Sequence, residues 1–150
     1  MQGEIEGFFA ECFPALGWSY EPAGRHSDIA GIREAYMRGG MFWCLFDEKK
    51  IIGTVAVRQI DETNKAAEMK RLYVLPEYQG RGYGDLLFKT AIGFAKEAGF
   101  QVIRLDTRQD RRASRHLIEK YRFRQIDQYN QNDFAELFYE LVLSECGLEE

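Results

Sequence analysis

The sequence is poor in cysteine and histidine, and their placement argues against a metal site. Its three cysteines, Cys12, Cys44 and Cys146, are odd in number and far apart, and the only histidines are His26 and His116. Together they show none of the spacings typical of metal ligands, so we expect no structural metal. Unpaired cysteines suit free thiols in a reducing compartment, which predicts a cytoplasmic protein.

Long apolar runs and an excess of positive charge are also missing. No apolar stretch approaches the ~18 residues that a membrane span needs. The first residues lack the basic start and apolar stretch of a signal peptide. The formal net charge is −4, and the basic residues between positions 104 and 124 are interspersed with acidic ones, as on a solvated face. We therefore expect neither a membrane nor a nucleic-acid partner.

The sequence does contain enough apolar material for a folded core. Of its 150 residues, 45% are hydrophobic and 14% are aromatic. No linker, repeat or low-complexity segment divides the chain. These features are typical of one globular domain, which we expect to span residues 1–150.

The apolar pattern predicts a mixture of helices and strands. Helical spacing predicts helices, and short apolar or alternating runs between turn residues predict strands. The helices are expected at residues 4–16, 27–36, 85–98 and 110–121, the last capped by Asp110. The strands are expected at 41–46, 51–60, 67–74, 101–106, 123–128 and 135–143. Hairpins followed by a β-α-β-α-β stretch predict an α/β fold, with a mixed sheet and helices on its faces.

The most informative segment is the glycine-rich run Gln79-Gly80-Arg81-Gly82-Tyr83-Gly84, between a predicted strand and a predicted helix. A turn of this kind presents unpaired backbone N–H groups and the positive end of a helix to an anion. Glycine lets the backbone approach a phosphate closely and allows positive φ angles. The segment therefore predicts a site for a phosphate-bearing ligand, with a plain tight turn as the alternative.

Two common nucleotide motifs fit this run poorly. A dinucleotide fingerprint requires its third glycine at Asp85, and its acidic ribose-binding residue would fall near Asp106, but the loop before that helix is too long. A P-loop requires Gly-Lys-Ser or Gly-Lys-Thr at its end, and the sequence has neither. A nucleotide-phosphate binder remains an alternative that only the glycines support.

Several motifs in order resemble the GNAT superfamily of N-acetyltransferases. Gln79-x-x-Gly82-x-Gly84 matches the R/Q-x-x-G-x-G/A signature, residues 68–78 resemble its lead-in, 103–107 the following strand, and 117–123 the terminal block. The resemblance covers residues 41–143. It implies a mixed, mostly antiparallel, twisted sheet that is splayed open between its fourth and fifth strands. It also implies direct transfer of an acetyl group from acetyl-coenzyme A, bound in that cleft, to a primary amine, which we expect to belong to a small molecule.

The resemblance also implies where the cofactor binds. Its pyrophosphate would lie on N–H groups of the glycine-rich run, with Arg81 adding a charge-assisted contact. Its pantetheine arm would pair like a strand with the backbone of Leu72, Tyr73 and Val74. Arg111 stands where relatives place an asparagine that touches the cofactor. The expected cofactor-binding residues are Leu72, Tyr73, Val74, Gln79, Gly80, Arg81, Gly82, Tyr83, Gly84 and Arg111.

Two residues are candidates for the chemistry. Glu68 lies where several related acetyltransferases carry the catalytic base, and a regular strand would place it on one face with Leu72 and Val74. A cross-strand ion pair is the alternative role for Glu68. The tyrosine that usually acts as the acid falls at Ile118, so Tyr121, on roughly the same helical face, is the substitute candidate. Core packing is the alternative role for Tyr121.

Other departures from the family pattern leave further questions open. Arg122 replaces the usual glycine before the last aromatic residue. The sequence starts almost directly in a helix at Glu4, so either the first edge strand is absent or the chain has been shortened, and a second copy in a homodimer could supply a missing strand. The altered tyrosine position keeps open a non-catalytic acyl-coenzyme A sensor or interaction module.

The acceptor pocket is the least specified part of the sequence. Its candidate residues are His26, Tyr36, Trp43, Tyr129 and Asn130. Aromatic residues at such positions commonly pack in a core. The pair Tyr129-Asn130 precedes the last predicted strand, so we expect it to face the mouth of the cleft.

Overall fold

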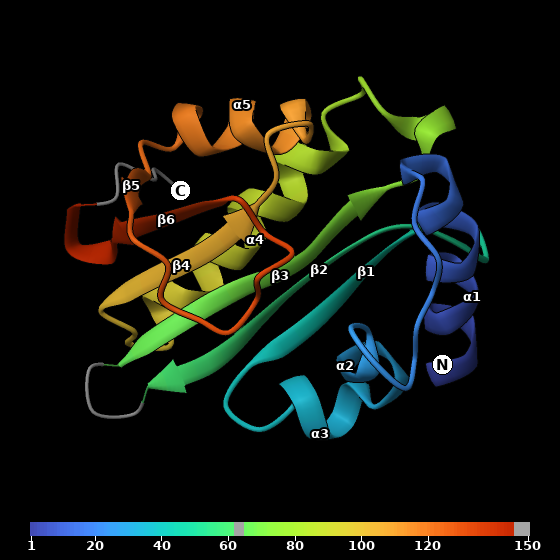
Figure 1. Cartoon of the computed structure of the whole chain (residues 1–150), viewed down its shortest axis with the longest axis horizontal. Coiled ribbons are helices and arrows are strands. Elements are labelled where there is room, and N and C mark those ends of the chain that lie inside the picture. Colours follow the sequence, from blue (N-terminus) through green and yellow to red (C-terminus); the bar gives the residue numbers. More distant parts are fainter. Residues whose placement is uncertain (62–64, 146–150) are drawn as a thin grey trace.

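The computed structural model of the chain describes residues 1–61 and 65–145. Its centre is a six-stranded sheet in the order β1-β2-β3-β4-β6-β5 (Figure 1). The strands are β1 (Met41–Asp47), β2 (Lys50–Asp61), β3 (Ala66–Val74), β4 (Val102–Thr107), β5 (Arg124–Ile126) and β6 (Leu137–Val142). Only β3 and β4 are parallel, and the other neighbours are antiparallel. The mixed, mostly antiparallel sheet expected from the sequence is confirmed.

Helices cover both faces of this sheet. The helices are α1 (Gln2–Cys12), α2 (Ser27–Ala30), α3 (Ile32–Tyr36), α4 (Tyr83–Glu97) and α5 (Arg112–Lys120), with 3-10 turns η1 (Phe13–Leu16), η2 (Pro76–Tyr78) and η3 (Leu143–Glu145). Helix α4 passes behind the sheet in Figure 1, and α1 to α3 cover the opposite face. No helix in the described ranges combines the length and apolarity that crossing a membrane requires.

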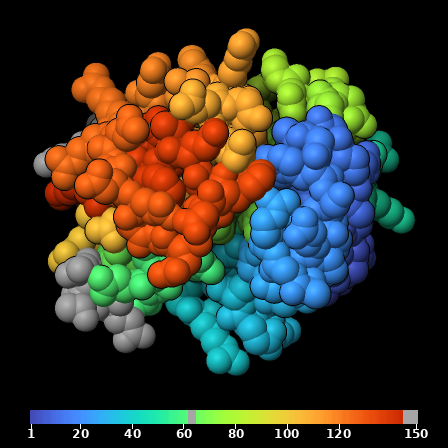
Figure 2. Space-filling view, viewed as in Figure 1, coloured from blue at the N-terminus to red at the C-terminus, as the bar shows by residue number. Residues whose placement is uncertain are grey.

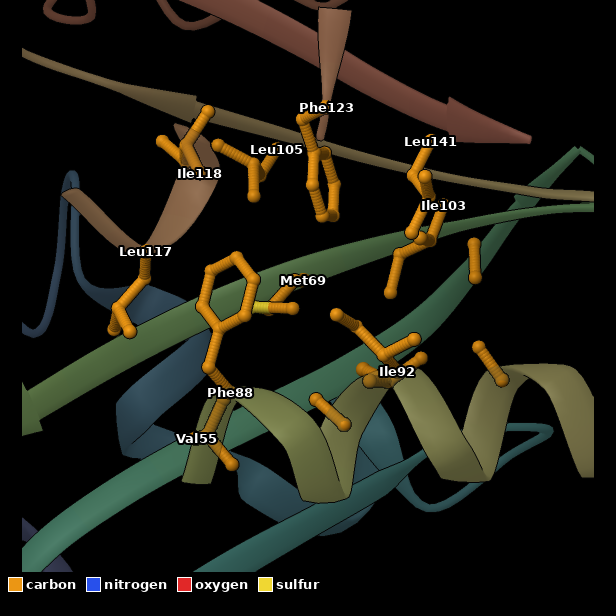
Figure 3. Packing of buried hydrophobic residues seen from close by; sticks show 14 of the residues in the cluster. Val55, Met69, Phe88, Ile92, Ile103, Leu105, Leu117, Ile118, Phe123 and Leu141 are labelled. Atoms are coloured by element: carbon orange, nitrogen blue, oxygen red, sulfur yellow. The ribbon is translucent and has the colours of Figure 1, made fainter. Parts of the chain in front are cut away.

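Two hydrophobic clusters, one on each face, hold these layers together. Behind the sheet, α4 buries the stripe predicted from its spacing: Leu87, Phe88, Ala91, Ile92 and Ala95. Figure 3 shows Phe88 and Met69 pointing toward one another within this cluster, close to Leu117 of α5. On the other face, α1 buries Ile5, Phe8, Phe9 and Cys12, also as its spacing predicts. The hydrophobic pattern therefore located both layers correctly.

Several helix ends differ from the prediction. The helix expected over residues 27–36 is interrupted at Gly31, whose φ of −140° and ψ of 67° are not helical. Helix α4 begins at Tyr83, two residues before the predicted Asp85, because Gly82 serves as its N-cap. Helix α5 has Arg111 at its N-cap and no side-chain cap, so Asp110 does not cap it as expected.

A β-bulge in β3 corrects the predicted alternation of its side chains. Thr54 pairs with Tyr73, and Ala56 pairs with Lys70, so two residues of β3 lie opposite a single residue of β2. Arg71 at the bulge has a φ of 59°. The extra residue reverses which side chains face α4. Leu72 and Val74 therefore pack on the α4 side, and Glu68 does not share their face.

The parallel pair β3 and β4 separates along its length. The two strands are in register only from Ala66 to Glu68, opposite Val102 to Arg104. Strand β3 continues to Val74 and β4 to Thr107, so their far ends diverge and leave a backbone edge of β3 facing the gap. The sheet is thus splayed, but between its third and fourth strands, β3 and β4, and not between the fourth and fifth as predicted.

The turn after α5 keeps a glycine-like geometry without glycine. Arg122 has a φ of 65°. Its N–H donates to the Glu119 carbonyl at 3.0 Å, and the Phe123 N–H donates to the Ile118 carbonyl at 3.0 Å. The sequence departs from the family pattern here, but the left-handed backbone conformation is retained.

Candidate active site

The turn leading into α4 leaves backbone N–H groups open. Gly80 and Gly82 have φ angles of 80° and 86°, and a Cβ at either position would meet nothing within 4 Å. The first hydrogen bond of the helix runs from the Leu86 N–H to the Gly82 carbonyl at 3.1 Å, and no side chain caps α4. The N–H groups of a first helical turn have no intrahelical acceptor. They are therefore available to an anion, as the glycine-rich run predicts.

Side chains around this turn fix its position against β3. The Gln79 Nε2 donates to the Val74 carbonyl at 2.9 Å. The exposed Arg81 donates to the Glu77 carbonyl at 3.2 Å, and its guanidinium lies 5.2 Å from the centre of the Tyr78 ring. Arg81 therefore stands at the outer rim of the turn, where its charge faces solvent.

A hollow of about 110 Å³ opens between this turn, the end of β3 and α5. Eight of the ten expected cofactor-binding residues line it: Leu72, Tyr73, Val74, Gln79, Gly80, Tyr83, Gly84 and Arg111. Arg81 and Gly82 adjoin it in sequence. The hollow combines open N–H groups with the unpaired edge of β3, so its residues fit a diphosphate joined to an amide-containing chain.

A larger cleft of about 440 Å³ opens at the splay, and Phe88 and Ile118 on the α4 side as well as Asp28 and Phe134 on the opposite side line it. Its walls include residues 25–28, the β3 and β4 strands, and residues 130–135 of the β5–β6 loop. Figure 1 shows this loop crossing in front of β4 and β3. In Figure 2 the same orange-red loop lies against the blue N-terminal segment, where the Phe134 ring is 5.3 Å from Trp18. The loop and the N-terminal segment together enclose the cleft.

The two hollows meet at the splay. Leu72, Tyr73, Arg111 and Ser114 line both of them. The Arg111 Nη2 donates to the Leu72 carbonyl at 3.1 Å, and its guanidinium lies 4.7 Å from the centre of the Tyr73 ring. Arg111 thus lies between the two hollows, and its hydrogen bond occupies a carbonyl on the free edge of β3. Sequence reasoning missed Ser114, although it lies one helical turn before Ile118, a spacing that places both on one face.

Glu68 is placed beneath this cleft rather than in it. Its side chain is 0% exposed and accepts from the Arg58 Nη2 at 2.9 Å. Its Oε2 accepts from the Tyr129 hydroxyl at 2.6 Å and from the Asn130 Nδ2 at 2.9 Å. Burial alone would raise the pKa of Glu68, but the charges of Lys70 and Arg58 and these hydrogen bonds outweigh it and hold the pKa below its usual value. The cross-strand ion pair considered from the sequence is present, and the carboxylate is buried.

Asp106 is one of two carboxylates that reach the cleft, and unlike Asp28 it is not paired with an arginine. It lies on β4 and lines the cleft wall. Its Oδ2 accepts from the Asn130 Nδ2 at 2.7 Å and from the Asn132 Nδ2 at 3.2 Å. Because Asn130 also donates to Glu68, one amide links the buried carboxylate to the accessible one. The sequence pointed to Asn130 at the cleft mouth, but gave Asp106 no catalytic role.

Tyr121 is not brought to the cleft, contrary to the expectation for a substitute acid. Its hydroxyl donates to the Asp85 Oδ1 at 2.6 Å, and its ring stacks on Phe88 with 5.3 Å between the centroids. It lies in the layer between α4 and α5, as a packed aromatic residue does. Ile118 lines the cleft instead and adds an apolar surface to it.

The remaining acceptor candidates divide into two groups. His26 lines the cleft, is buried, and accepts the Glu21 N–H on its Nδ1 at 2.8 Å. Tyr36 is fully buried and its hydroxyl donates to Asp28. Trp43 packs against Phe94 on the α4 side, with 5.3 Å between the ring centroids. Tyr36 and Trp43 are therefore core residues, and His26 is a cleft residue.

The bulge residue Arg71 fixes one wall of the cleft. Its Nη2 and Nε donate to the two carboxylate oxygens of Asp28 at 2.7 and 2.9 Å. Its Nη2 also donates to the Arg25 carbonyl at 3.1 Å. Burial opposes ionisation of Asp28, but the hydrogen bonds from Arg71 prevail and lower the pKa of that carboxyl to about 2. A paired, largely buried charge therefore joins α2 to β3.

The chain is similar in sequence to a known protein family and to several named proteins. The model of the Acetyltransferase (GNAT) family matches residues 5–123. N-acetyltransferase 8B of Homo sapiens is 26% identical over 114 residues, which are 73% of this chain and 50% of that protein. N-acetylaspartate synthetase of Danio rerio is 28% identical over 110 residues, 72% of this chain and 39% of that protein. The chain thus spans about half or less of the length of these relatives.

The fold itself is shared with solved acetyltransferase structures. A GNAT-family acetyltransferase from Staphylococcus aureus Mu50 superposes with a TM-score of 0.83 at 21% identity, covering 95% of this chain and 92% of that chain. At this level of identity the likeness concerns the fold alone.

Proposed function

The chain belongs to the acetyltransferase (GNAT) family, and we propose that it moves an acetyl group from acetyl-coenzyme A directly to the primary amine of a small molecule. The observation that carries this proposal is the meeting of two hollows at Leu72, Tyr73, Arg111 and Ser114. One hollow fits a diphosphate and an amide chain, and the other is a larger cleft that joins it at the splay. Such an arrangement allows two substrates to meet at the end of β3.

Acetyl-coenzyme A, when bound, supplies the acetyl group as an activated thioester. The N–H groups at the start of α4 hold its diphosphate, and the positive end of the helix favours that charge. The free edge of β3 from Leu72 to Val74 pairs with its amides. The guanidinium of Arg111 has to leave the Leu72 carbonyl for this edge to become available, and its charge then lies within reach of the cofactor.

The acceptor has to lose a proton, because an ordinary alkyl ammonium has a pKa near ~10. We assign the proton-accepting role to Asp106, since it lines the cleft, and we keep Glu68 as the residue that positions it through Asn130. A backbone N–H near Leu72 is the donor for charge developing on the acetyl oxygen. We assign to Ser114, which lines both hollows, the role of hydrogen-bond donor to the departing thiolate, whose thiol has a pKa near ~8.5.

The names of the relatives support an amine acceptor. The names of both relatives describe N-acetyl chemistry, and one of the names contains that of an amino acid. Since the chain spans only part of each relative, the acceptor of those proteins is not transferred to it. We also keep two sequence-based expectations as proposals: a cytoplasmic location, and a homodimer in which a second copy supplies the missing edge strand.

The decisive experiment measures release of free thiol from acetyl-coenzyme A with a panel of primary amines. Asp106→Asn should lower kcat by about 100-fold while leaving acetyl-coenzyme A affinity unchanged, as loss of a general base does. Glu68→Gln should lower both activity and thermal stability. A non-catalytic acyl-coenzyme A sensor would bind the cofactor and release no thiol with any amine, in the wild type and in both variants. That result would overturn the proposed function.

A further inference from the structure

The side chains that line the 440 Å³ cleft carry an excess of positive charge. Its basic residues are Arg25, Arg58, Lys70, Arg71, Arg108 and Arg111, and its acidic residues are Asp28 and Asp106. His26 adds no charge at neutral pH, because burial and the nearby arginines lower its pKa to about 4. The cleft is therefore cationic, although the whole chain has a formal net charge of −4.

The carboxylates near the cleft are already paired with particular arginines. Asp28 holds Arg71 through two hydrogen bonds. The buried Glu68 holds Arg58. At the rim, Arg25 pairs with the exposed Glu21 at 3.4 Å, and Arg108 lies 3.6 Å from Glu136. These pairs neutralise part of the charge.

Two cations of the cleft, Lys70 and Arg111, and one carboxylate, Asp106, are left without an ion pair in the described residues. Within residues 1–61 and 65–145, neither Lys70 nor Arg111 forms an ion pair with a carboxylate. Arg111 lines both hollows, and the passage of the cofactor accounts for its charge. Lys70 lines only the acceptor cleft, on the same strand as Leu72, where the acetyl group is delivered. Its charge helps to lower the pKa of Glu68 and of Asp28, but its ammonium forms no ion pair with either carboxylate, so it remains available to a bound anion.

We propose that the acceptor amine carries a carboxylate and that Lys70 binds this group, which makes small amino acids the substrate class. The inference rests on the proposed acetyl transfer and specifies its acceptor. A cationic cleft attracts an anionic or zwitterionic amine and repels a polycation. Lys70 and Leu72 flank the bulge residue Arg71, and both line the cleft. That placement suits a short molecule whose amine reaches Leu72 while its carboxylate contacts Lys70.

The test compares acceptors that differ only in the carboxylate. The probes are L-alanine with ethylamine, L-phenylalanine with phenethylamine, L-aspartate, and spermidine as a polycation, all with acetyl-coenzyme A. We expect kcat/KM to be at least about tenfold higher for the amino acid of each pair. Lys70→Ala should raise KM for amino acids by about tenfold and leave the decarboxylated amines unaffected, and Lys70→Glu should reverse the preference. Lys96→Ala, at the exposed end of α4, is the matched control and should change neither value.

The outcomes separate this inference from the proposed function. Thiol release that favours ethylamine, phenethylamine or spermidine would overturn the amino-acid assignment and leave the acetyltransferase proposal intact. Equal losses for both members of a pair in Lys70→Ala would overturn the role of Lys70. The wild-type comparison needs no variant, so it decides the substrate class even where a Lys70 variant fails to fold. No release with any amine would overturn both proposals together.

Discussion

The Tyr129 hydroxyl donates a 2.6 Å hydrogen bond to Glu68 Oε2, although the two residues are 61 positions apart. This contact joins the β5–β6 loop to the middle of β3. Arg58 and Asn130 also donate to the same carboxylate, so Glu68 is a buried charge with three protein partners. Such a carboxylate holds the cleft wall together, and its ionised form is favoured by every donor around it.

Tyr129→Phe should lower the free energy of unfolding by about 1–2 kcal/mol, because it removes one donor from a buried carboxylate. Urea unfolding followed by tryptophan fluorescence measures the change. Tyr139→Phe is the matched control, since no hydrogen bond of its hydroxyl is found in the described part of the chain, and it should change stability by less than about 0.5 kcal/mol. Equal effects of the two substitutions would show that the Glu68 contact contributes nothing.

Local sequence signals predicted the layers well because each arises from neighbouring residues. The stripe on α4 and the strand–glycine–helix turn are patterns within one segment, and both were confirmed. The bulge at Arg71 has no such signal, since neither glycine nor proline marks it. Its conformation accompanies an ion pair with Asp28, 43 residues away. A contact over that sequence distance cannot be inferred from one segment. The bulge that accompanies it reverses the face on which Leu72 lies.

The position of Asp106 shows that the active site, too, depends on contacts between distant residues that a local sequence pattern does not reveal. A local reading placed Glu68 correctly on β3, but its burial depends on Tyr129 and Asn130 of a loop far along the chain. The same loop leaves Asp106 facing the cleft. Which carboxylate is accessible is therefore decided by tertiary packing, and the sequence alone favoured the buried one.

Gly84→Ala should affect stability and cofactor affinity in opposite directions. A Cβ at Gly84 would meet only the Leu117 Cδ1, at an ordinary 3.7 Å, and alanine favours a helix over glycine by up to about 1 kcal/mol. The variant should therefore unfold at slightly higher temperature. The added methyl group would lie where the proposed diphosphate site approaches the backbone, so coenzyme A affinity should fall by about tenfold or more.

Isothermal titration with coenzyme A and thermal unfolding measure the two effects. Gly93→Ala provides the control on the same helix, because a Cβ there meets nothing within 4 Å and the residue does not line the cofactor hollow. It should raise stability and leave affinity unchanged. Unaltered coenzyme A affinity in Gly84→Ala would contradict a diphosphate site at this turn.

His26 should make the protein less stable in mild acid. Burial, with the charges of Arg71 and Arg25, lowers its pKa from 6.5 to about 4, against the opposite influence of Asp28 and Glu21. Between these pH values the unfolded chain binds a proton that the folded chain does not, so the free energy of unfolding falls as pH is lowered. The loss should reach about 3 kcal/mol between pH 6.5 and 4.

The contribution of His26 to the free energy of unfolding is isolated by comparing variants over this pH range. His26→Asn retains an acceptor for the Glu21 N–H and should flatten the stability profile relative to the wild type. His116→Asn removes the exposed histidine of α5 and should leave the profile unchanged. Parallel profiles for the wild type and His26→Asn would refute the assignment.

Arg122→Gly should stabilise the protein, since Arg122 holds a φ of 65° at the end of α5. A left-handed conformation costs a non-glycine residue roughly 1–2 kcal/mol, and the greater freedom of glycine in the unfolded chain offsets about 0.5–1 kcal/mol of the relief. The expected net gain is about 1 kcal/mol in the free energy of unfolding. Arg122→Ala is the control: it removes the same exposed guanidinium but keeps the positive φ, so it should give no gain. If both variants unfold at the same urea concentration, the turn carries no backbone strain, and the substitution of arginine for the usual glycine has no energetic consequence.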